Sequence, residues 1–430
     1  MTDTARPDAA GSDAAGSDAG PAAVPRAAVD PDAAFDEAAF AALRQQVEAF
    51  VTGPGERYAE QIERDGDVPE ALWEDLRDRG YLSLAAPTEY GGAGLPFSRY
   101  LELMELFSMS HASLRMIVHV VNGVWRSIDE FATDEQRARF VLPVVAGRTR
   151  AAFTLTEPTA GTGADLRCSL TRDPADPDTY LLSGEKHLIT FGVKCDYWLL
   201  FARLDGSTGR DGTVALMVDR STPNVRVEPM AETMGVRGTD HAHLIFDRAP
   251  VPVANRLGAE GDGLEVALGG FLMPSRVSVA MSCVGLARRA HELACQHALT
   301  RTTFGKKLAQ RQAISFMIAE NAADIEAARQ LVLHAARAWE RGAAAAAALS
   351  SMSKLTAVDM LTRVTDKALQ IHGGIGYWSS KTIERVYRDA RAQRFEEGTN
   401  EIQKTVIARE VLRDWQAAAD RAANEEDTSR

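Results

Sequence analysis

The sequence predicts an α+β multidomain protein in which helical segments flank a small β domain. Helical periodicity runs from about residue 35 to 150 and returns from about 263 to 417. Between these runs, residues 151–262 hold short β-rich stretches separated by turn residues. We therefore expect an N-terminal helical domain, a central small β domain and a C-terminal four-helix bundle.

The composition is that of an ordinary globular protein. The 430 residues are 45% hydrophobic and 25% charged, and 60 acidic against 48 basic side chains give a net charge of −12. This balance argues against nucleic acid or anionic lipid as the main partner. The four cysteines lack CxxC or other metal spacing, so we expect no disulfide framework and no metal. Because we find neither a long apolar run nor a signal peptide, we expect a cytoplasmic protein without a membrane segment.

Residues 1–34 are expected to form a disordered acidic tail. They are mostly Ala, Gly, Asp, Ser and Pro, with a repeat in AAGSDAAGSDAG, and offer too few apolar side chains for a core. The first 40 residues contain eight acids and two arginines, so 8 − 2 supplies half of the net −12. The folded remainder is only mildly acidic.

The N-terminal helices and the β domain have separate signals. Phe40, Leu43, Val47 and Phe50 have amphipathic spacing, and glycines at 91–94 predict a loop. The β-rich stretches are YLL at 180–182, YWLLFAR at 197–203 and TVALMV at 213–218, and their turns are Ser183-Gly184, Asp205-Gly206 and Asp211-Gly212.

Long periodic segments predict the bundle. Their apolar positions are Val277, Met281 and Val284, then Ile314, Met317, Ile318, Ile325 and Val332, then Leu355, Val358, Leu361 and Val364. Gly373-Gly374 breaks the pattern, and a fourth segment begins near Ile402. Residues 418–430 are polar and are expected to be a frayed tail.

Two segments near the β domain could bind a ligand. In AFTLTEPTAGTGADL at 152–166, threonine hydroxyls and glycine amides suit a flat or anionic ligand. In KHLITFG at 186–192, Thr190 lies among apolar neighbours. An interdomain turn and a plain strand are the alternatives for these two segments.

Three further segments lie in the C-terminal region. RTTFGKK at 301–307 combines cations with a glycine, which suits phosphate or complements a helix end. The three glycines of QIHGGIG at 370–376 suggest close backbone approach to a pyrophosphate. In RFEEGTNEIQ at 394–403, Glu396 and Glu397 are adjacent and cannot both face one site. One of them is a candidate base, and a solvated acidic turn is the alternative.

Taken together, these motifs resemble the acyl-CoA dehydrogenase family over about residues 36–413. The motifs that carry the resemblance occur in the family's order. They are LTEPTAG at 155–161, KHLITFG at 186–192, AETMGVRGT at 231–239, RTTFGKKL with RQAISFMIAE within 301–320, QIHGGIGY at 370–377, RDAR at 388–391 and EEGTNEIQ at 396–403.

The resemblance implies bound FAD and a homotetramer. The positions that correspond to flavin contacts are Phe153, Leu155, Thr156, Thr162, Leu188, Ile189, Thr190, Thr399 and Glu401, with Thr156 and Thr190 as hydrogen-bond donors. The positions that correspond to the pyrophosphate and adenosine of a neighbouring subunit's FAD are Arg301, Thr303, Arg311, Gln312, Gln370, Gly373 and Gly374.

The resemblance also implies α,β-dehydrogenation of an acyl thioester. Glu397 falls on the family's catalytic base, whereas Ser275 stands where some relatives carry the base and cannot abstract a proton. The product would be a trans-2-enoyl thioester, with hydride passing to flavin N5 and reoxidation by electron-transferring flavoprotein. Thr162, Arg276 and Gly398 are expected to contact the substrate.

Several departures leave alternatives open. Leu188 replaces a tryptophan that many members have, Gly163 replaces an aspartate, and Met273 replaces an aspartate of medium-chain relatives. These differences leave three points undecided. They are the identity of the acyl group, whether its thiol is coenzyme A or that of a carrier protein, and whether the electron acceptor is the flavoprotein or O₂. An acyl-CoA oxidase is the nearest alternative. A flavin monooxygenase of the same fold is less favoured, because such enzymes commonly lack a glutamate at the position of Glu397. A non-catalytic flavin-binding protein is also less favoured. His241-Ala-His243 has no evident third metal ligand.

Overall fold

The N-terminal part of the chain is helical, as its periodicity predicts. The computed structural model describes residues 36–159 and 165–428, so the predicted acidic tail and Thr162 lie outside the described residues. The N-terminal elements are α1 (Glu37–Thr52), α2 (Pro54–Asp65), α3 (Glu70–Asp78), η1 (Thr88–Tyr90), α4 (Phe97–Phe107), α5 (Ala112–Asp129), α6 (Asp134–Gln136), η2 (Arg137–Val141) and α7 (Leu142–Val145).

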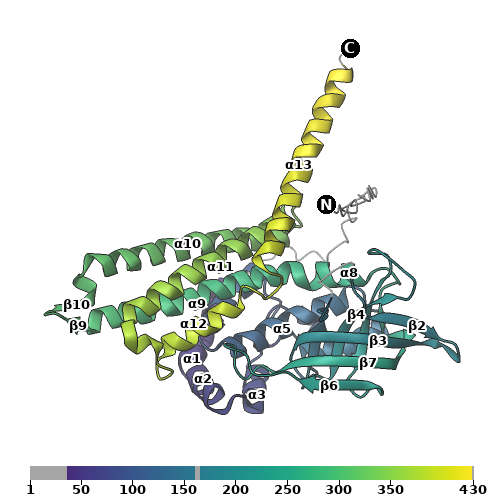
Figure 1. Cartoon of the computed structure of the whole chain (residues 1–430), viewed down its shortest axis with the longest axis horizontal. Helices are drawn as coiled ribbons and strands as arrows, with labels where there is room; N and C mark the ends of the chain where they lie inside the picture. The colour runs from purple at the N-terminus through teal and green to yellow at the C-terminus, as the bar shows by residue number, and fades with distance from the viewer. Residues whose placement is uncertain (1–35, 160–164, 429–430) are drawn as a thin grey trace, which may run out of the picture. The chain divides into compact units, whose positions relative to one another are not determined.

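Local signals set the ends of these helices. α2 begins with a proline, whose fixed φ suits a first turn, and it ends at Gly66 with φ of 66°. α5 begins after His111, whose Nδ1 accepts a hydrogen bond of 3.0 Å from the Ser113 N–H. Nearly all of α5 is buried, and it lies at the centre of the N-terminal part (Figure 1).

The central part is one mostly antiparallel sheet. Among the described residues its strands follow the order β6-β7-β3-β2-β4-β5-β8, and β1 pairs in parallel with β4. The strands are β1 (Ala151–Thr154), β2 (Ser169–Asp173), β3 (Asp176–Thr190), β4 (Tyr197–Leu204), β5 (Thr213–Asp219), β6 (Val225–Pro229), β7 (His241–Pro252) and β8 (Arg256–Leu257), with η3 (Val253–Asn255) before the last. The predicted β-rich stretches are β3, β4 and β5.

The C-terminal part is built on long antiparallel helices (Figure 1). Its elements are α8 (Gly263–Glu265), η4 (Val266–Leu272), α9 (Met273–Thr300), β9 (Thr302–Thr303), β10 (Lys306–Lys307), η5 (Leu308–Gln310), α10 (Gln312–Glu340), α11 (Ala346–His372), η6 (Gly373–Tyr377), α12 (Thr382–Ala392) and α13 (Asn400–Thr428). α9, α10, α11 and α13 are the predicted bundle helices, and α12 is an additional short helix.

α13 extends to Thr428, so it includes most of residues 418–430, for which a frayed tail stays a prediction. One expectation about this region needs correction. The helical stretch from Gly263 to Thr300 contains a window apolar enough to cross a membrane, although no such run was expected, and 72% of that window is buried inside the fold. Its burial identifies this stretch as a core helix of the bundle.

One hydrophobic cluster joins the three parts within the compact unit Ala38–Arg430. It contains Trp125 of α5, Phe140 of η2, Leu199 of β4 and Phe271 of η4. η4 is π-helical, and such irregular turns recur at functional sites. The cluster fixes η4 and the start of α9 against α5, which brings the residues of the candidate site together.

Candidate active site

The two predicted flavin segments lie side by side at one end of the sheet. The His187 N–H donates a 2.9 Å hydrogen bond to the Thr156 carbonyl. Register shifts in β3 between Lys186 and Ile189 accompany a positive φ of 59° at Leu188, whose side chain is 55% exposed, while Ile189 is buried. The bulge therefore turns Leu188 out of the sheet beside the segment that follows β1.

A buried ion pair fixes the first of these segments. Glu157 accepts hydrogen bonds from Lys186 Nζ at 2.8 Å and from the N–H groups of Arg167 at 2.7 Å and Cys168 at 3.0 Å. Lys186 Nζ also donates to the Leu155 carbonyl at 2.9 Å. Because these hydrogen bonds engage its carboxylate fully, Glu157 has a structural role and is not a candidate catalytic residue.

The exposed groups of these segments fit a flavin ring. Thr156 and Thr190 are partly exposed, and their hydroxyls can donate to the polar edge of the ring. Leu188 offers apolar surface to its flat face. Phe153 packs against Phe271 with ring centroids 4.5 Å apart, so this predicted cofactor residue also joins the flavin segment to η4.

The second predicted set of FAD residues gathers at the far end of the bundle. The rings of His297 and His372 stack at 4.5 Å, which places the end of α9, with Arg301, beside the end of α11. The predicted residues there are Arg301, Thr303, Arg311, Gln312, Gln370, Gly373 and Gly374, all exposed or partly exposed. In Figure 1 the β9–β10 hairpin of this set lies at the opposite end of the unit from the sheet. The two sets of one chain therefore lie apart.

The three glycines of the QIHGGIG motif are present for different physical reasons. Gly373 ends α11 with φ of 65°, and a Cβ at Gly373 or Gly374 would meet open space. A Cβ at Gly376 would lie 2.8 Å from the His372 Cβ, so that glycine permits a tight turn. Only the first two leave backbone open to a ligand.

The structure separates the two adjacent glutamates. Glu396 pairs with the buried Arg115 of α5 through two hydrogen bonds of 2.9 Å. Burial acts to raise the pKa of Glu396, but the Arg115 guanidinium outweighs it and lowers that pKa. Glu397 Oε1 instead lies 3.7 Å from His119 Nε2, one turn further along α5. Glu397 is thus the carboxylate available for chemistry.

The backbone at Glu397 is strained and firmly held. Glu397 has φ of 54° and Gly398 has φ of 95°. Lys354 Nζ donates to the Gly398 carbonyl at 2.8 Å, and the Gln403 amide donates to the Glu397 carbonyl at 3.0 Å. Burial lowers the pKa of Arg276, whose Nε donates to the same Glu397 carbonyl at 3.4 Å. Three elements thus fix where the carboxylate points.

Two more predicted flavin contacts follow this turn. Thr399 is partly exposed and Glu401 is exposed in the first turn of α13. The pKa of Glu401 is lowered by its own backbone N–H and by the Thr399 hydroxyl. Both residues therefore lie next to the proposed base, although on the outer side of the turn.

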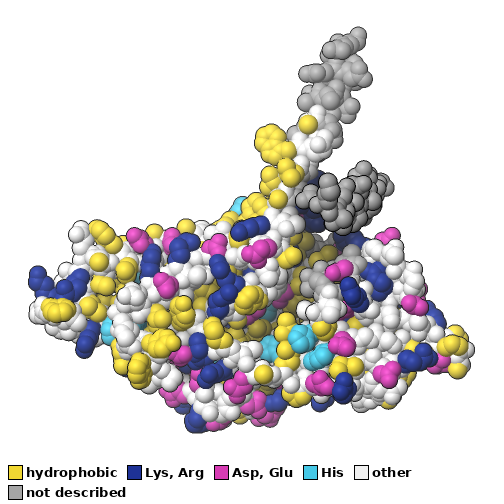
Figure 2. All heavy atoms as spheres, viewed as in Figure 1, with side chains coloured by type: hydrophobic (Ala, Val, Ile, Leu, Met, Phe, Trp, Pro, Cys, Tyr) yellow, Lys and Arg dark blue, Asp and Glu magenta, His cyan; other side chains and the backbone are white. Residues whose placement is uncertain are grey.

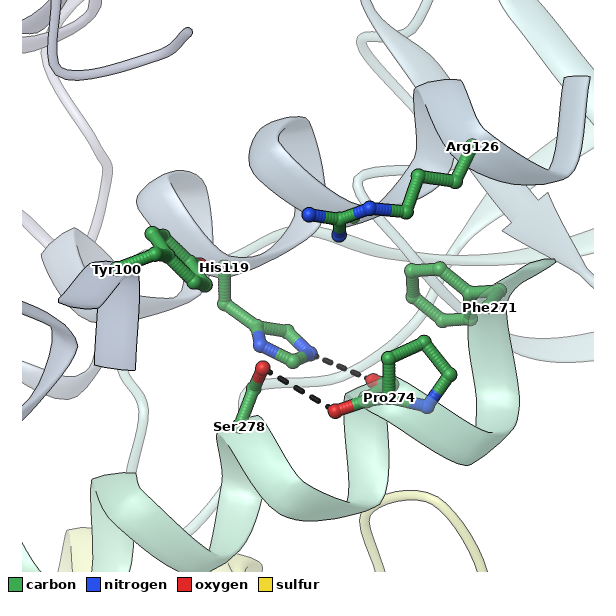
Figure 3. Close-up of a pocket in the computed structure, with 8 residues that line it drawn as sticks. Tyr100, His119, Arg126, Phe271, Pro274 and Ser278 are labelled. Atoms are coloured by element: carbon green, nitrogen blue, oxygen red, sulfur yellow. Dashed lines mark hydrogen bonds between the residues drawn. The ribbon is translucent and has the colours of Figure 1, made fainter. Parts of the chain in front are cut away.

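A small cavity lies beside His119, between α5 and the start of α9 (Figure 3). Its volume is about 10 Å³, and its lining consists of Tyr100, His119, Gly123, Arg126, Phe271, Pro274, Ser275 and Ser278. His119 Nε2 and the Ser275 hydroxyl are 2.9 Å apart. Ser275, the position at which some relatives carry the base, thus lines this cavity as a hydrogen-bonding group.

Sequence reasoning missed Arg115, His119, Lys354 and Gln403. The available signal was a charged and an ionisable residue, Arg115 and His119, four positions apart within the mainly apolar stretch 114–121. A buried charge in such a helix requires a partner, and its identity depends on contacts between segments distant in sequence.

Three family profiles match the chain in succession. The acyl-CoA dehydrogenase N-terminal domain matches residues 38–148, the middle domain matches 152–249 and the C-terminal domain matches 261–412. The chain belongs to the acyl-CoA dehydrogenase family. This membership confirms the predicted fold class, the oxidoreductase class and FAD as the cofactor.

Individual acyl-CoA dehydrogenases are similar along most of the chain. The acyl-CoA dehydrogenase of Bacillus subtilis (strain 168) is 35% identical, covering 86% of this chain and 97% of that protein. The mitochondrial short-chain specific acyl-CoA dehydrogenase of Bos taurus is 33% identical, covering 87% and 90%. The structure of butyryl-CoA dehydrogenase from Megasphaera elsdenii has a TM-score of 0.82 at 30% identity, covering 87% and 98%.

Proposed function

We propose that this acyl-CoA dehydrogenase removes hydrogen from the α and β carbons of a short acyl-CoA, with Glu397 as the base. The separation of the two glutamates carries the proposal, because Arg115 engages Glu396 and leaves Glu397 near His119, which lines the cavity. The positive φ of Glu397 and the hydrogen bonds to its carbonyl hold that carboxylate in a defined direction.

The chain's own residues supply the proton transfer. Glu397 takes the proton from Cα, and its carboxylate is only 14% exposed, so little water solvates it. The Glu397 N–H can donate to the thioester oxygen, where negative charge develops as the proton leaves. FAD, when bound against Thr156, Leu188 and Thr190, supplies the hydride acceptor that no side chain can provide. The product is a trans-2-enoyl thioester.

Replacement of the base tests this proposal. We expect Glu397→Gln to slow anaerobic bleaching of the flavin by butyryl-CoA by roughly a thousandfold, with FAD content unchanged. The matched control is Glu396→Gln, which should keep measurable bleaching because it leaves the base in place. Near wild-type bleaching by Glu397→Gln would show that the base is another group. A panel that includes carrier-protein thioesters distinguishes the two thiol carriers.

The assembly belongs to the same proposal. We propose a homotetramer in which the bundle end of one chain completes the FAD site of another, because the two predicted FAD sets lie apart in one chain. Exposed apolar side chains support an interface: Phe304 is 98% exposed on the hairpin, and Leu412 and Trp415 are 67% and 73% exposed on α13. Figure 2 shows hydrophobic side chains on the projecting part of α13.

The electron acceptor is also a proposal. Electron-transferring flavoprotein is supported by a relative named as the CarC subunit of a caffeyl-CoA reductase-Etf complex of Acetobacterium woodii, which is 32% identical over 82% of this chain. The exposed Leu188 marks the side of the flavin segment from which an acceptor can approach. A comparison of the rates at which that flavoprotein and O₂ reoxidise the reduced flavin distinguishes a dehydrogenase from an oxidase.

A further inference from the structure

The wall of the cavity beside His119 is mainly apolar, and the buried polar side chains His119 and Ser275 are part of it. His119 is 3% exposed, and its Nε2 faces both the Ser275 hydroxyl at 2.9 Å and Glu397 Oε1 at 3.7 Å. Its Nδ1 has no hydrogen-bond partner among the described residues. A buried polar atom without a partner is unfavourable, so this nitrogen favours a ligand that can form a hydrogen bond with it.

The cavity is also short. Phe271 closes it against α5, since a Cβ on Gly123 would lie 3.1 Å from the Phe271 ring. Figure 3 shows His119 projecting from α5 toward α9, with Tyr100 and Arg126 on the other sides. The volume of about 10 Å³ is close to the space that one water molecule needs. This cavity therefore accepts about one non-hydrogen atom.

We propose that His119 and Ser275 form a polar subsite that binds a hydroxyl oxygen on a short acyl group. This inference rests on the proposed function, because it takes Glu397 as the group that approaches Cα. The reaction removes one hydrogen each from Cα and Cβ, so the hydroxyl must be on Cγ or beyond. The substrate class is therefore a short hydroxyacyl thioester.

The chemistry of the subsite suits a hydroxyl oxygen. A neutral imidazole has one donor and one acceptor nitrogen, and a hydroxyl pairs with either. A terminal methyl group would leave Nδ1 unpaired.

Two acyl-CoAs of the same size test the subsite. In 4-hydroxybutyryl-CoA a hydroxyl replaces the terminal methyl of pentanoyl-CoA, so their ratio of kcat/KM reports the hydrogen bond. We expect the holoenzyme to favour the hydroxyacyl substrate by about tenfold or more in anaerobic flavin reduction. His119→Leu should abolish or reverse this preference, and His119→Gln, which keeps a donor and an acceptor, should retain part of it.

Ser275→Ala is a second test that removes only one hydroxyl from the cavity wall. It should reduce the preference while the flavin content and melting temperature stay close to wild type. Equal or better use of pentanoyl-CoA by the wild-type enzyme, or an unchanged ratio in His119→Leu, would overturn the inference and leave the proposed function intact. Failure of both substrates to bleach the flavin would overturn the proposed function and this inference with it.

Discussion

At the scale of single residues, two neighbouring glutamates have different partners. Glu396 pairs with the buried guanidinium of Arg115, and Glu397 lies 3.7 Å from His119, one turn further along α5. By engaging Glu396, Arg115 leaves Glu397 as the carboxylate to which the proposed function assigns the role of base.

The Arg115–Glu396 pair predicts a specific stability loss. Glu396→Gln leaves the 0%-exposed Arg115 guanidinium without a charged partner, so we expect the free energy of unfolding to fall by about 3–5 kcal/mol. Urea unfolding at neutral pH measures the change. The double variant Arg115→Met/Glu396→Met, which removes both charges, should recover much of it. Wild-type stability of Glu396→Gln would show that the pair contributes little.

At the scale of elements, a close helix crossing fixes the core of the bundle. α9 passes against α4 at Gly285, where a Cβ would lie 2.2 Å from the Glu105 carbonyl oxygen. The buried Glu105 carboxylate accepts hydrogen bonds from Arg288 of α9 and, at 2.9 Å, from Arg329 of α10. Glu105 thus contacts Gly285 through its backbone carbonyl and links α4, α9 and α10 through its carboxylate.

This crossing predicts the effect of one methyl group. Gly285→Ala should lower the free energy of unfolding by about 1–3 kcal/mol, although Ala is the better helix former, because two backbones must separate. Gly269→Ala is the matched control, since a Cβ there would meet only ordinary contacts at 3.6 Å or more. Thermal unfolding compares the two variants. Equal melting temperatures of the two variants would show that the close approach of α9 and α4 does not require a glycine at position 285.

At the scale of the whole molecule, Glu63 links the N-terminal helices to the C-terminal part. This residue of α2 lies 3.1 Å from His111 Nε2, at the start of α5, and accepts a 2.7 Å hydrogen bond from Arg388 of α12. Burial acts to raise the pKa of Glu63, but hydrogen bonds to His111 and Arg388 outweigh it and lower that pKa to about 2.

The lowered pKa of Glu63 predicts acid sensitivity. Its stabilisation is fully present above the ordinary value of 4.5 and is lost as pH falls from 4.5 toward 2. The shift corresponds to roughly 3 kcal/mol. Glu63→Gln should therefore be less stable at neutral pH and lose less stability in this window than the wild type. Urea midpoints measured from pH 6 to about 3 test it, and parallel profiles for the two proteins would contradict it.

Much of the architecture follows from periodic patterns in the sequence. Apolar spacing in residues 277–284, 314–332 and 355–364 predicted α9, α10 and α11, because an amphipathic helix face depends only on the order of residues within one segment. The same reasoning did not name α12, although its buried side chains Ile383, Val386 and Ala390 follow a helical period. The motifs indicated FAD, and family membership confirms it.

The sequence by itself determined the order of domains, the family and the segment that contains the proposed base. Only the tertiary structure decided which glutamate is free to act, because that choice depends on Arg115, which is 281 positions before Glu396 in the chain. It also placed His119 and Ser275, 156 positions apart, on one cavity wall. The physical reason is that charge pairing and pocket shape arise from contacts between distant segments, which no local pattern records.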